Sequence, residues 1–583
     1  MTDRPFVLDD LHRVVTPTET SISPDGTVVV FVRSEIVAGK ATTSLWAVSR
    51  DSQARRLTAG PADSAPRFSP DGTSIAFLRK VGDSAQLHLI PLAGGEAETL
   101  TTSASLPLGA GAAAWSPDGN AIAFAAVVSR SDSADPNAPI VTDRLGYKVD
   151  GAGWLGTFRR HLHTVDLETK AVRRLTDGDW NADVPSWSPD GTALAFTANL
   201  EPDSDLNLTF SAYRILVDDL SVPPQRLGHA TGVQGSTLWH PQGDSVVAIG
   251  TPEVRVGTAD LIRLSVPGPT ETPVDVTLTA HLDRNVMPGA PGYPGGTPAL
   301  SNTRDEIVFC LRDRGWTHLY AADIETGTSR SLVANPNEVV SALSVARDAR
   351  VASVIVTTQQ SFGEVALVDL DSGAVTTLTK FTAEALPEVT LFAAEEREFT
   401  ISDGRTVHGW LLSAPETSGA APLLLDIHGG PHNAWTGVAD TYHPAHQVLA
   451  AQGWRILTLN PRGSDGYGAD FMYAVNGAWG TSDQADFLEP IDALVAEGLV
   501  DGDRLAITGY SYGGYSTCHL TSQTDRFAAA VAGGLICDFN AMAGVCDFGP
   551  HLASLATGTT VPENSAGLLA ASPIPMICQK PAA

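Results

Sequence analysis

Residues 509–515 read Gly-Tyr-Ser-Tyr-Gly-Gly-Tyr, a G-x-S-x-G sequence that begins where an apolar run ends and a helix-compatible run begins. In that context the motif predicts a nucleophile elbow, a tight turn between a strand and a helix that presents a strained serine with its hydroxyl exposed. Only glycine-sized neighbours let the strand and the helix approach so closely. Ser511 is therefore the predicted nucleophile, and a serine hydrolase is the leading hypothesis.

The residues around this motif alternate between strand and helix patterns. Residues 399–415 resemble a hairpin about a Ser402-Asp403-Gly404 turn. The segments that follow are strands at 423–427, 454–459, 504–508 and 527–532, with helices at 483–497 and 513–522. Such alternation predicts a mostly parallel sheet covered on both faces. The chemical domain then begins near residue 386.

A second glycine-rich segment, His428-Gly429-Gly430-Pro431, follows the first of the predicted parallel strands. α/β-Hydrolases place backbone N–H groups for the oxyanion hole at this position. Negative charge develops on the carbonyl oxygen during nucleophilic attack, and each fixed donor contributes about 3 to 4 kcal/mol. We expect the backbone N–H groups of Gly430 and Tyr512 to be these donors, Tyr512 because it follows the nucleophile.

The first two thirds of the chain repeat a turn followed by a strand. Proline presets φ, Asp bonds its own backbone and Gly takes the positive φ, so the tetrapeptide Ser-Pro-Asp-Gly predicts a chain reversal. Copies of the tetrapeptide begin at Ser23, Ser69, Ser116 and Ser188, and weaker copies begin at residues 240, 301 and 346. Repeats of about 45 residues with four strands each are typical of a β-propeller. The turns predict seven blades within residues 1–385.

Three features of the repeat region have a structural and a binding interpretation. Aromatic residues before the turns are interpreted as core side chains; they are Phe68, Trp115, Trp187 and Trp239. His161 and His163 are interpreted as surface residues on one face of a strand, since no acidic partner for a metal site accompanies them. The polar insertion at residues 130–139 is interpreted as a solvated loop, with a binding loop as the alternative.

Composition argues against several classes of partner. The 66 Asp and Glu against 37 Lys and Arg give a formal net charge of -29, which opposes binding to nucleic acid and to anionic membranes. Neither a signal-peptide h-region nor a run of 18 apolar residues is present. Five scattered cysteines predict neither a disulfide framework nor a metal site. We expect a cytoplasmic protein without a cofactor.

These motifs together resemble the prolyl oligopeptidase family of serine peptidases, and within it the acylaminoacyl-peptidase-like branch. The resemblance depends on His428-Gly429-Gly430-Pro431, on residues 460–468 (Asn-Pro-Arg-Gly-Ser-Asp-Gly-Tyr-Gly), on the elbow and on the Ser-Pro-Asp-Gly turns. It implies a seven-bladed propeller at 1–385 that restricts entry to an α/β-hydrolase domain at 386–583. It also implies a short peptide or N-acylated peptide as substrate, Ser511 as nucleophile, and Gly430 and Tyr512 as the oxyanion hole. A homo-oligomer is compatible with it.

The chain departs from the family pattern after the nucleophile. In the family the triad acid and histidine lie on later strands, at positions that would fall past Ala583, and residues 575–583 do not resemble the next strand. We therefore expect a C-terminally truncated hydrolase domain. None of the candidate bases within the chain is expected to complete a triad; they are His428, His432, His519 and His551.

Loss of the triad base lowers kcat by about 10⁶-fold in a measured protease, so impaired activity is expected. Two alternatives remain open. One is a non-catalytic propeller that binds peptides and retains a decayed hydrolase domain. The other is an esterase that acts on small acyl esters.

Overall fold

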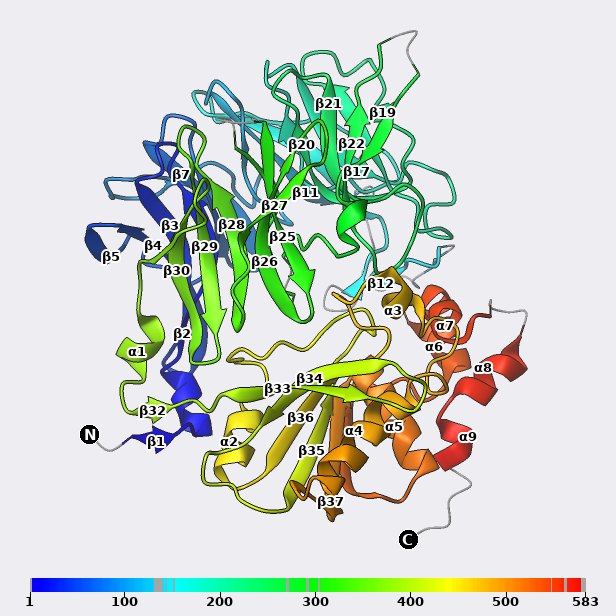
Figure 1. Ribbon diagram of the computed structural model, residues 1–583. Coiled ribbons are helices and arrows are strands. Elements are labelled where there is room, and N and C mark those ends of the chain that lie inside the picture. The colour runs from blue at the N-terminus through cyan, green and yellow to red at the C-terminus, as the bar shows by residue number, and fades with distance from the viewer. Residues whose placement is uncertain are drawn as a thin grey trace.

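The computed structural model describes residues 3–129, 139, 141–142, 144–149, 153–268, 272–289, 293–301, 305–546, 548–559 and 564–577. It has two parts, which lie one above the other in Figure 1. The first part consists of small antiparallel sheets arranged around a ring and is called here the propeller domain. The second part is a six-stranded mixed sheet with helices and is called the hydrolase domain.

The described residues of the propeller domain form five separate four-stranded antiparallel sheets and one eight-stranded sheet. The eight-stranded sheet consists of two consecutive sets, β24 to β27 and β28 to β31, joined by a single parallel pairing of Thr317 with Val339. The strands of the first three sheets are β2 (Val15–Ile22), β3 (Val28–Val37), β4 (Lys40–Ser49), β5 (Ser52–Arg56); β6 (Asp63–Phe68), β7 (Ser74–Val81), β8 (Ser84–Pro91), β9 (Glu98–Thr99); β10 (Ala114–Trp115), β11 (Ala121–Ser129), β14 (Phe158–Asp166) and β15 (Val172–Arg174).

The remaining strands of this domain continue the series around the ring. They are β16 (Ser186–Trp187), β17 (Ala193–Ala198), β18 (Ser211–Leu216), β19 (Gln225–Leu227); β20 (Gly232–Trp239), β21 (Ser245–Thr251), β22 (Asp260–Ser265), β23 (Asp275–Thr277); β24 (Ala299–Ser301), β25 (Glu306–Asp313), β26 (Trp316–Asp323), β27 (Ser329–Val333); β28 (Glu338–Val345), β29 (Val351–Thr358), β30 (Ser361–Asp369) and β31 (Val375–Thr377). A short hairpin, β12 (Lys148–Val149) and β13 (Gly153–Trp154), lies outside these sheets.

The predicted Ser-Pro-Asp-Gly turns are confirmed. In each copy the glycine N–H donates to the serine carbonyl at 2.9 Å, and the glycine has a φ of 73° to 75°. The serine hydroxyl donates to the Asp carboxylate at 2.5 to 2.6 Å, which fixes the turn between the first two strands of a sheet. Of the weaker copy that begins at Ser301, the three residues 302–304 lie outside the described residues.

The aromatic residues before the turns link neighbouring sheets as well as filling the core. Trp115, Trp187 and Trp239 each donate the indole N–H to a main-chain carbonyl of the preceding sheet, at 2.9 to 3.2 Å. These three side chains and Phe68 also pack with the hydrophobic clusters between sheets. The core prediction is therefore confirmed, because a sheet of a propeller buries its faces only against its neighbours.

The prediction that His161 and His163 are surface residues is wrong. They are 0% and 4% exposed. The two ring nitrogens of His161 lie 3.2 Å from the Thr176 hydroxyl and from the Gly178 carbonyl. Both faces of β14 are covered by adjacent sheets, so alternation along the strand does not mark a solvent side. The predicted loop at 130–139 lies outside the described residues except for residue 139.

The hydrolase domain confirms the predicted hairpin and the predicted strands. Its strand order is β33-β34-β36-β35-β37-β38, with β35 to β38 parallel to one another. The strands are β33 (Ala394–Thr400), β34 (Thr406–Leu412), β35 (Ala421–Ile427), β36 (Arg455–Asn460), β37 (Val500–Tyr510) and β38 (Phe527–Gly533). The helices are α2 (Ala445–Ala451), α3 (Ala469–Tyr473), α4 (Gln484–Ala496), α5 (Tyr512–Gln523), α6 (Phe539–Val545), α7 (Gly549–Thr557), α8 (Ser565–Ala571) and α9 (Ile574–Ile577).

The predicted cover on both faces holds over the central strands, where α4 and α5 pack on one face and α2 on the other, and fails at β38. β38 is the terminal strand, and residues 528–531 are exposed, Val531 to 70%. Helices α6, α7 and α8 add their apolar side chains to the cluster that holds α4 and α5, and α9 contacts α5. The opposite face carries α2, which packs on β34, β35 and β36 and does not reach β38, so this face is open at β38 among the described residues.

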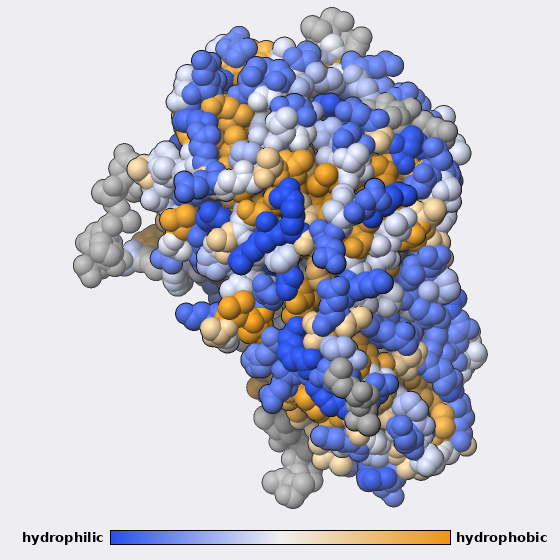
Figure 2. Space-filling model, turned by 90° about the vertical axis from the view of Figure 1, so that its left-hand side faces the viewer, coloured by the Kyte–Doolittle hydropathy of each residue, from blue (hydrophilic) through white to orange (hydrophobic). Residues whose placement is uncertain are grey.

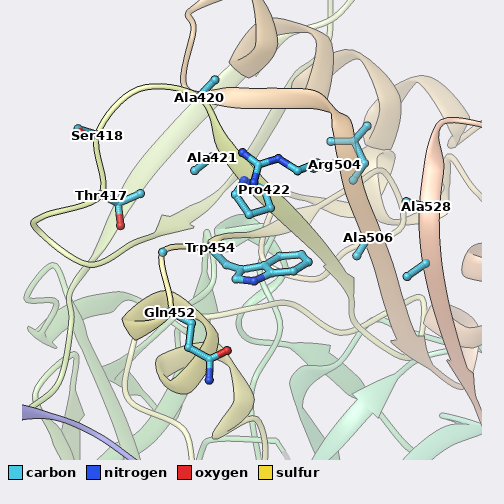
Figure 3. A pocket seen from close by; sticks show the side chains of 13 residues that line it. Thr417, Ser418, Ala420, Ala421, Pro422, Gln452, Trp454, Arg504, Ala506 and Ala528 are labelled. Carbon is cyan, nitrogen blue, oxygen red and sulfur yellow. The ribbon is translucent and has the colours of Figure 1, made fainter.

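A cavity of about 620 Å³ lies on this open side, at the amino ends of the parallel strands (Figure 3). Its lining includes Pro422, Trp454, Ala506 and Ala528. Ser511 follows the carboxyl end of β37, so this cavity lies at the other end of the sheet from the elbow.

Short segments connect the two domains. β1 (Arg4–Pro5) pairs in parallel with β32 (Val389–Thr390), and Phe6 packs in a cluster with residues before and within α2. The propeller side carries α1 (Phe381–Ala385) and two 3₁₀ turns, Leu8–His12 and Ala280–Leu282. Hydrophilic side chains cover most of the face that bears β1 and α1, with apolar side chains in patches between them (Figure 2). No helix of the described residues is long and apolar enough to cross a membrane.

Candidate active site

Ser511 lies in a strained turn between β37 and α5. Its φ of 59° and ψ of -118° are rare for a residue with a side chain, and such strain persists only where surrounding contacts fix it. The Ser511 N–H donates to the Gly533 carbonyl at 3.0 Å, and its carbonyl accepts from Tyr515 N–H at 2.9 Å. The half-buried hydroxyl makes no hydrogen bond with another described residue. It is therefore available to a ligand.

The glycines of the motif allow the helix to lie directly on the sheet. A Cβ atom added to Gly513 would lie 2.0 Å from the Ile427 carbonyl oxygen, and one added to Gly509 would lie 2.5 Å from the Gly513 main chain. One added to Gly514 would lie 2.3 Å from the Gly533 carbonyl oxygen. These contacts involve backbone atoms, which cannot rotate away. The sequence requirement for glycine is thus a packing requirement of the elbow.

We expect Gly513→Ala to lower the free energy of unfolding by about 2 kcal/mol, as overpacking of a close contact does. Urea unfolding followed by tryptophan fluorescence would measure it. Gly544→Ala in α6 is the matched control, because a Cβ there would meet no atom within 4 Å. If both variants unfold at the same urea concentration, the steric account of the elbow is wrong.

The glycine-rich loop after β35 lies beside the elbow. A Cβ atom on Gly429 would be 3.4 Å from Ser511 Cβ. Gly430 has a φ of 129° and precedes a cis peptide bond to Pro431. The N–H groups of Gly430 and Tyr512 donate to no other described residue, and that of Tyr512 is one of the free donors in the first turn of α5. The two sequence-predicted donors thus both have unused N–H groups, Tyr512 directly after Ser511 and Gly430 in the loop beside it.

His428 shapes this loop and has both ring nitrogens engaged. Nδ1 lies 2.7 Å from the Gly429 carbonyl oxygen and Nε2 lies 3.0 Å from the Ser464 hydroxyl. Burial lowers the pKa of His428 to about 4, so the ring is neutral at pH 7. In the tautomer that satisfies both contacts, Nδ1–H donates to Gly429 and Nε2 accepts from Ser464. His428 is therefore a structural support of the loop.

The other candidate histidines are also held away from Ser511. His432 Nδ1 donates to the Gly463 carbonyl at 2.9 Å. His519 lies in the second turn of α5, where its ring stacks on Tyr515 and Nε2 is 2.9 Å from the Gln484 amide nitrogen. His551 lies on α7 and packs against Phe548. Among the described residues, no histidine forms a hydrogen bond with the Ser511 side chain.

Asp483 lies under the elbow and is not indicated by the sequence. The Tyr512 hydroxyl donates to its carboxylate, and the Trp479 ring packs edge-on against Tyr512 at 5.0 Å. Burial raises the pKa of Asp483 to about 6. In the sequence, Asp483 lies at the start of a predicted helix, and an Asp at that position usually caps the helix. Its side chain makes no cap hydrogen bond here and binds the buried Tyr512 hydroxyl instead.

A buried arginine of the propeller domain reaches the same loops. Arg312, on β25, is 0% exposed, and its Nη1 lies 2.8 Å from Asn433 Oδ1 and 3.5 Å from Asp465 Oδ2. Asp465 N–H donates to the Asn433 carbonyl at 2.9 Å. The loop at 428–433 and the loop at 460–468 are thus held together from across the domain junction.

This chain is similar to known peptidases. The model of the "Prolyl oligopeptidase family" matches residues 441–575. The uncharacterized peptidase YuxL of Bacillus subtilis is 31% identical over 560 residues, which span 93% of this chain and 84% of the relative. Dipeptidyl-peptidase 5 of Porphyromonas gingivalis is 25% identical over 549 residues, 88% of this chain and 76% of the relative.

The fold is similar to that of a solved acylaminoacyl peptidase from Pyrococcus horikoshii. The TM-score is 0.80 at 20% sequence identity, and the match covers 97% of this chain and 84% of the other. At this identity the likeness shows the fold, in which a propeller is combined with a hydrolase domain.

Proposed function

Because the chain belongs to the prolyl oligopeptidase family and is a serine peptidase, we propose that it cleaves short peptides or N-acylated peptides through an acyl-enzyme on Ser511. The observation that carries the proposal is the strained Ser511 with a free hydroxyl, which is followed by Tyr512 and lies beside the Gly429-Gly430 loop, with the N–H groups of Gly430 and Tyr512 both unused among the described residues. The names of the relatives, a dipeptidyl-peptidase and an acylaminoacyl peptidase, support peptides as the substrate class.

In the proposed reaction, the Ser511 oxygen attacks the carbonyl carbon and its proton passes to a base. The carbonyl oxygen becomes an oxyanion that accepts hydrogen bonds from Gly430 and Tyr512 N–H. The tetrahedral intermediate collapses, the amine leaves with a proton, and water hydrolyses the ester to the acid. The positive end of the α5 dipole adds to the stabilisation of the oxyanion.

We also propose that residues 1–583 alone turn over peptides slowly. The described histidines near Ser511 are engaged with Gly429, Gly463 and Gln484, so the Ser511 proton passes to water. Without the base, the oxyanion hole and substrate binding retain roughly 10³ to 10⁴ of the acceleration over water.

The propeller domain, residues 1–385, is proposed to have seven blades and to limit the size of peptides that enter. The five four-stranded sheets and the two sets of the eight-stranded sheet support this count. The hydrolase domain is proposed to begin at residue 386, after α1, which contacts strands of the propeller. The hydrolase domain lies below the propeller domain in Figure 1, and this placement supports a restricted route to the elbow before α5.

The test combines labelling and turnover. A fluorophosphonate probe is expected to label the parent slowly and Ser511→Ala not at all, because phosphonylation requires the serine oxygen. Hydrolysis of acetyl-alanine p-nitroanilide is expected to be detectable but slow, and lost in Ser511→Ala.

Each other outcome has a definite meaning. Labelling that survives Ser511→Ala would exclude Ser511 as the nucleophile. Amide turnover by the parent at about 10 s⁻¹, the median for enzymes, would show that a base is present and exclude the slow-turnover proposal. Ester turnover with no amide turnover would favour a small-ester esterase. Peptide binding without any labelling would favour a non-catalytic peptide-binding protein.

A further inference from the structure

A cavity of about 510 Å³ lies between the propeller domain and the hydrolase domain. Segments within residues 251–260 and 277–285 line it on the propeller side, and residues 465–472 line it on the hydrolase side. Met472 is part of this lining, and a Cβ atom on Gly257 would lie 2.7 Å from Met472 Sδ and 3.0 Å from the His432 ring. His432 belongs to the loop that carries Gly430. The cavity is thus one layer of side chains away from the loop beside Ser511.

Carboxylates outnumber available cations in the lining. Asp260 accepts from the Thr279 hydroxyl through Oδ1 at 2.8 Å, and Asp283 accepts from Ala469 N–H through Oδ1 at 2.9 Å. The second oxygen of each forms no hydrogen bond with another described residue. Glu253 adds an exposed carboxylate.

The two arginines of the lining do not neutralise these groups. Arg284 is already held by Asp313 at 2.6 Å, which leaves Arg255 as the available cation in the described lining. Asp260 and Asp283 are close enough to repel each other, and this repulsion adds to burial in raising the pKa of Asp260. A cation between the two carboxylates would relieve the repulsion.

Asp465 is a buried acid of the cavity lining with one unpaired carboxylate oxygen among the described residues. Its side chain is 3% exposed and lines the cavity, yet Oδ1 has no hydrogen-bond partner among the described residues. Its other oxygen lies 3.5 Å from Arg312 Nη1. A buried polar atom without a partner is costly, and in native structures it often indicates a missing water or ligand. Asn285 and the Gly466 N–H, which belong to the same lining, lie near this carboxyl, and a ligand donor would complete its hydrogen bonding.

We propose that this cavity binds a positively charged group of the peptide substrate, an ammonium or a guanidinium. Both groups present several N–H donors, which match the free oxygens of Asp260, Asp283 and Asp465. Charge-assisted hydrogen bonds of this kind are roughly twice as strong as neutral ones. The identification of the ligand as a substrate rests on the proposed function, whereas the binding of a cation does not.

Calorimetry with four peptides tests the proposal and separates the two sources of charge. The probes are Arg-Ala-Ala-Phe, its N-acetyl form, its citrulline analogue and the N-acetyl citrulline form, each titrated into the Ser511→Ala protein to prevent turnover. We expect the N-acetyl citrulline form, which has neither cationic group, to bind at least about tenfold more weakly than Arg-Ala-Ala-Phe. The N-acetyl form lacks only the α-ammonium and the citrulline analogue lacks only the guanidinium, so these two peptides show which group occupies the cavity. Equal affinity for all four peptides, or no binding, would overturn the proposal.

Substitutions of the lining carboxylates show whether the charge-dependent binding occurs in this cavity. Asp260→Asn keeps the acceptor for Thr279 but removes the charge, and we expect it to weaken binding of Arg-Ala-Ala-Phe about tenfold while binding of the N-acetyl citrulline peptide is unchanged. Asp283→Asn keeps the acceptor for Ala469 and serves as the second variant. Glu416→Gln, an exposed acid outside the lining, is the control for net charge.

The two proposals fail separately. If charge-dependent binding is found but the probe does not label Ser511 in the parent, the cation site stands and the peptidase mechanism is wrong. If Ser511 is labelled while Asp260→Asn and Asp283→Asn bind all four peptides as their parent does, the peptidase stands and the cation site is wrong.

Discussion

Arg462→Met is expected to lower the free energy of unfolding of the hydrolase domain by about 3 to 5 kcal/mol, because it leaves a buried carboxylate without its cation. Asp486, on α4, is 0% exposed. Arg462 donates to it from Nε, from Nη2 and from its main-chain N–H, at 2.5 to 3.0 Å. Methionine retains the apolar stem of the side chain, so the variant removes mainly the charge and its hydrogen bonds.

The same arginine fixes the loop next to the active site. Residues 460–468 contain Ser464, which supports His428, and Gly463, which supports His432. We therefore expect Arg462→Met also to slow labelling of Ser511. Urea unfolding of the hydrolase domain, followed by tryptophan fluorescence, measures the stability change.

Arg405→Met is the matched control. Arg405 forms an ion pair with Asp403, a carboxylate that Arg462 also contacts. Its side chain is 45% exposed and lies 3.3 Å from Asp403. Exposed pairs contribute about 0 to 1 kcal/mol, so a small change is expected. A loss in Arg462→Met no larger than in Arg405→Met would show that Asp486 does not depend on its arginine.

Asp483 is expected to make the hydrolase domain less stable as the pH rises from about 4 to about 6. Burial raises its pKa from 3.8 to about 6 in the folded protein. Between these values the folded state binds more protons than the unfolded state, so the contribution of this carboxyl to stability is largest below pH 4 and falls as the carboxyl ionises. A shift of this size corresponds to about 3 kcal/mol.

Asp483→Asn is expected to remove this slope. Asparagine keeps an oxygen that accepts from the Tyr512 hydroxyl but carries no titrating proton. Trp479, which packs on Tyr512, reports the transition by fluorescence in urea at pH 4.5 to 7. Glu416→Gln should keep the parent slope. An unchanged slope in Asp483→Asn would exclude this carboxyl as the titrating group.

Local signals were sufficient for much of the fold. The Ser-Pro-Asp-Gly turns, the hairpin at Ser402-Asp403-Gly404 and the strands of the hydrolase sheet follow from residues adjacent in sequence. Ser511 and its flanking glycines were found in the same way, because the elbow requires its strain and close packing within one short segment. Where a prediction depended on what covers a strand, it was wrong, as for His161 and His163.

The chain by itself therefore determined the repeat, the alternation of strands and helices, and a serine at a turn with small neighbours, since torsional preference and hydrophobic period act over a few residues. Only the tertiary structure decided which distant groups meet. It placed Arg312 of the propeller against Asn433 and Asp465, placed Asp483 under Tyr512, and left the far face of β38 open. Electrostatic and packing energies depend on distance in space, and pairs so far apart in sequence carry no local mark of their contact.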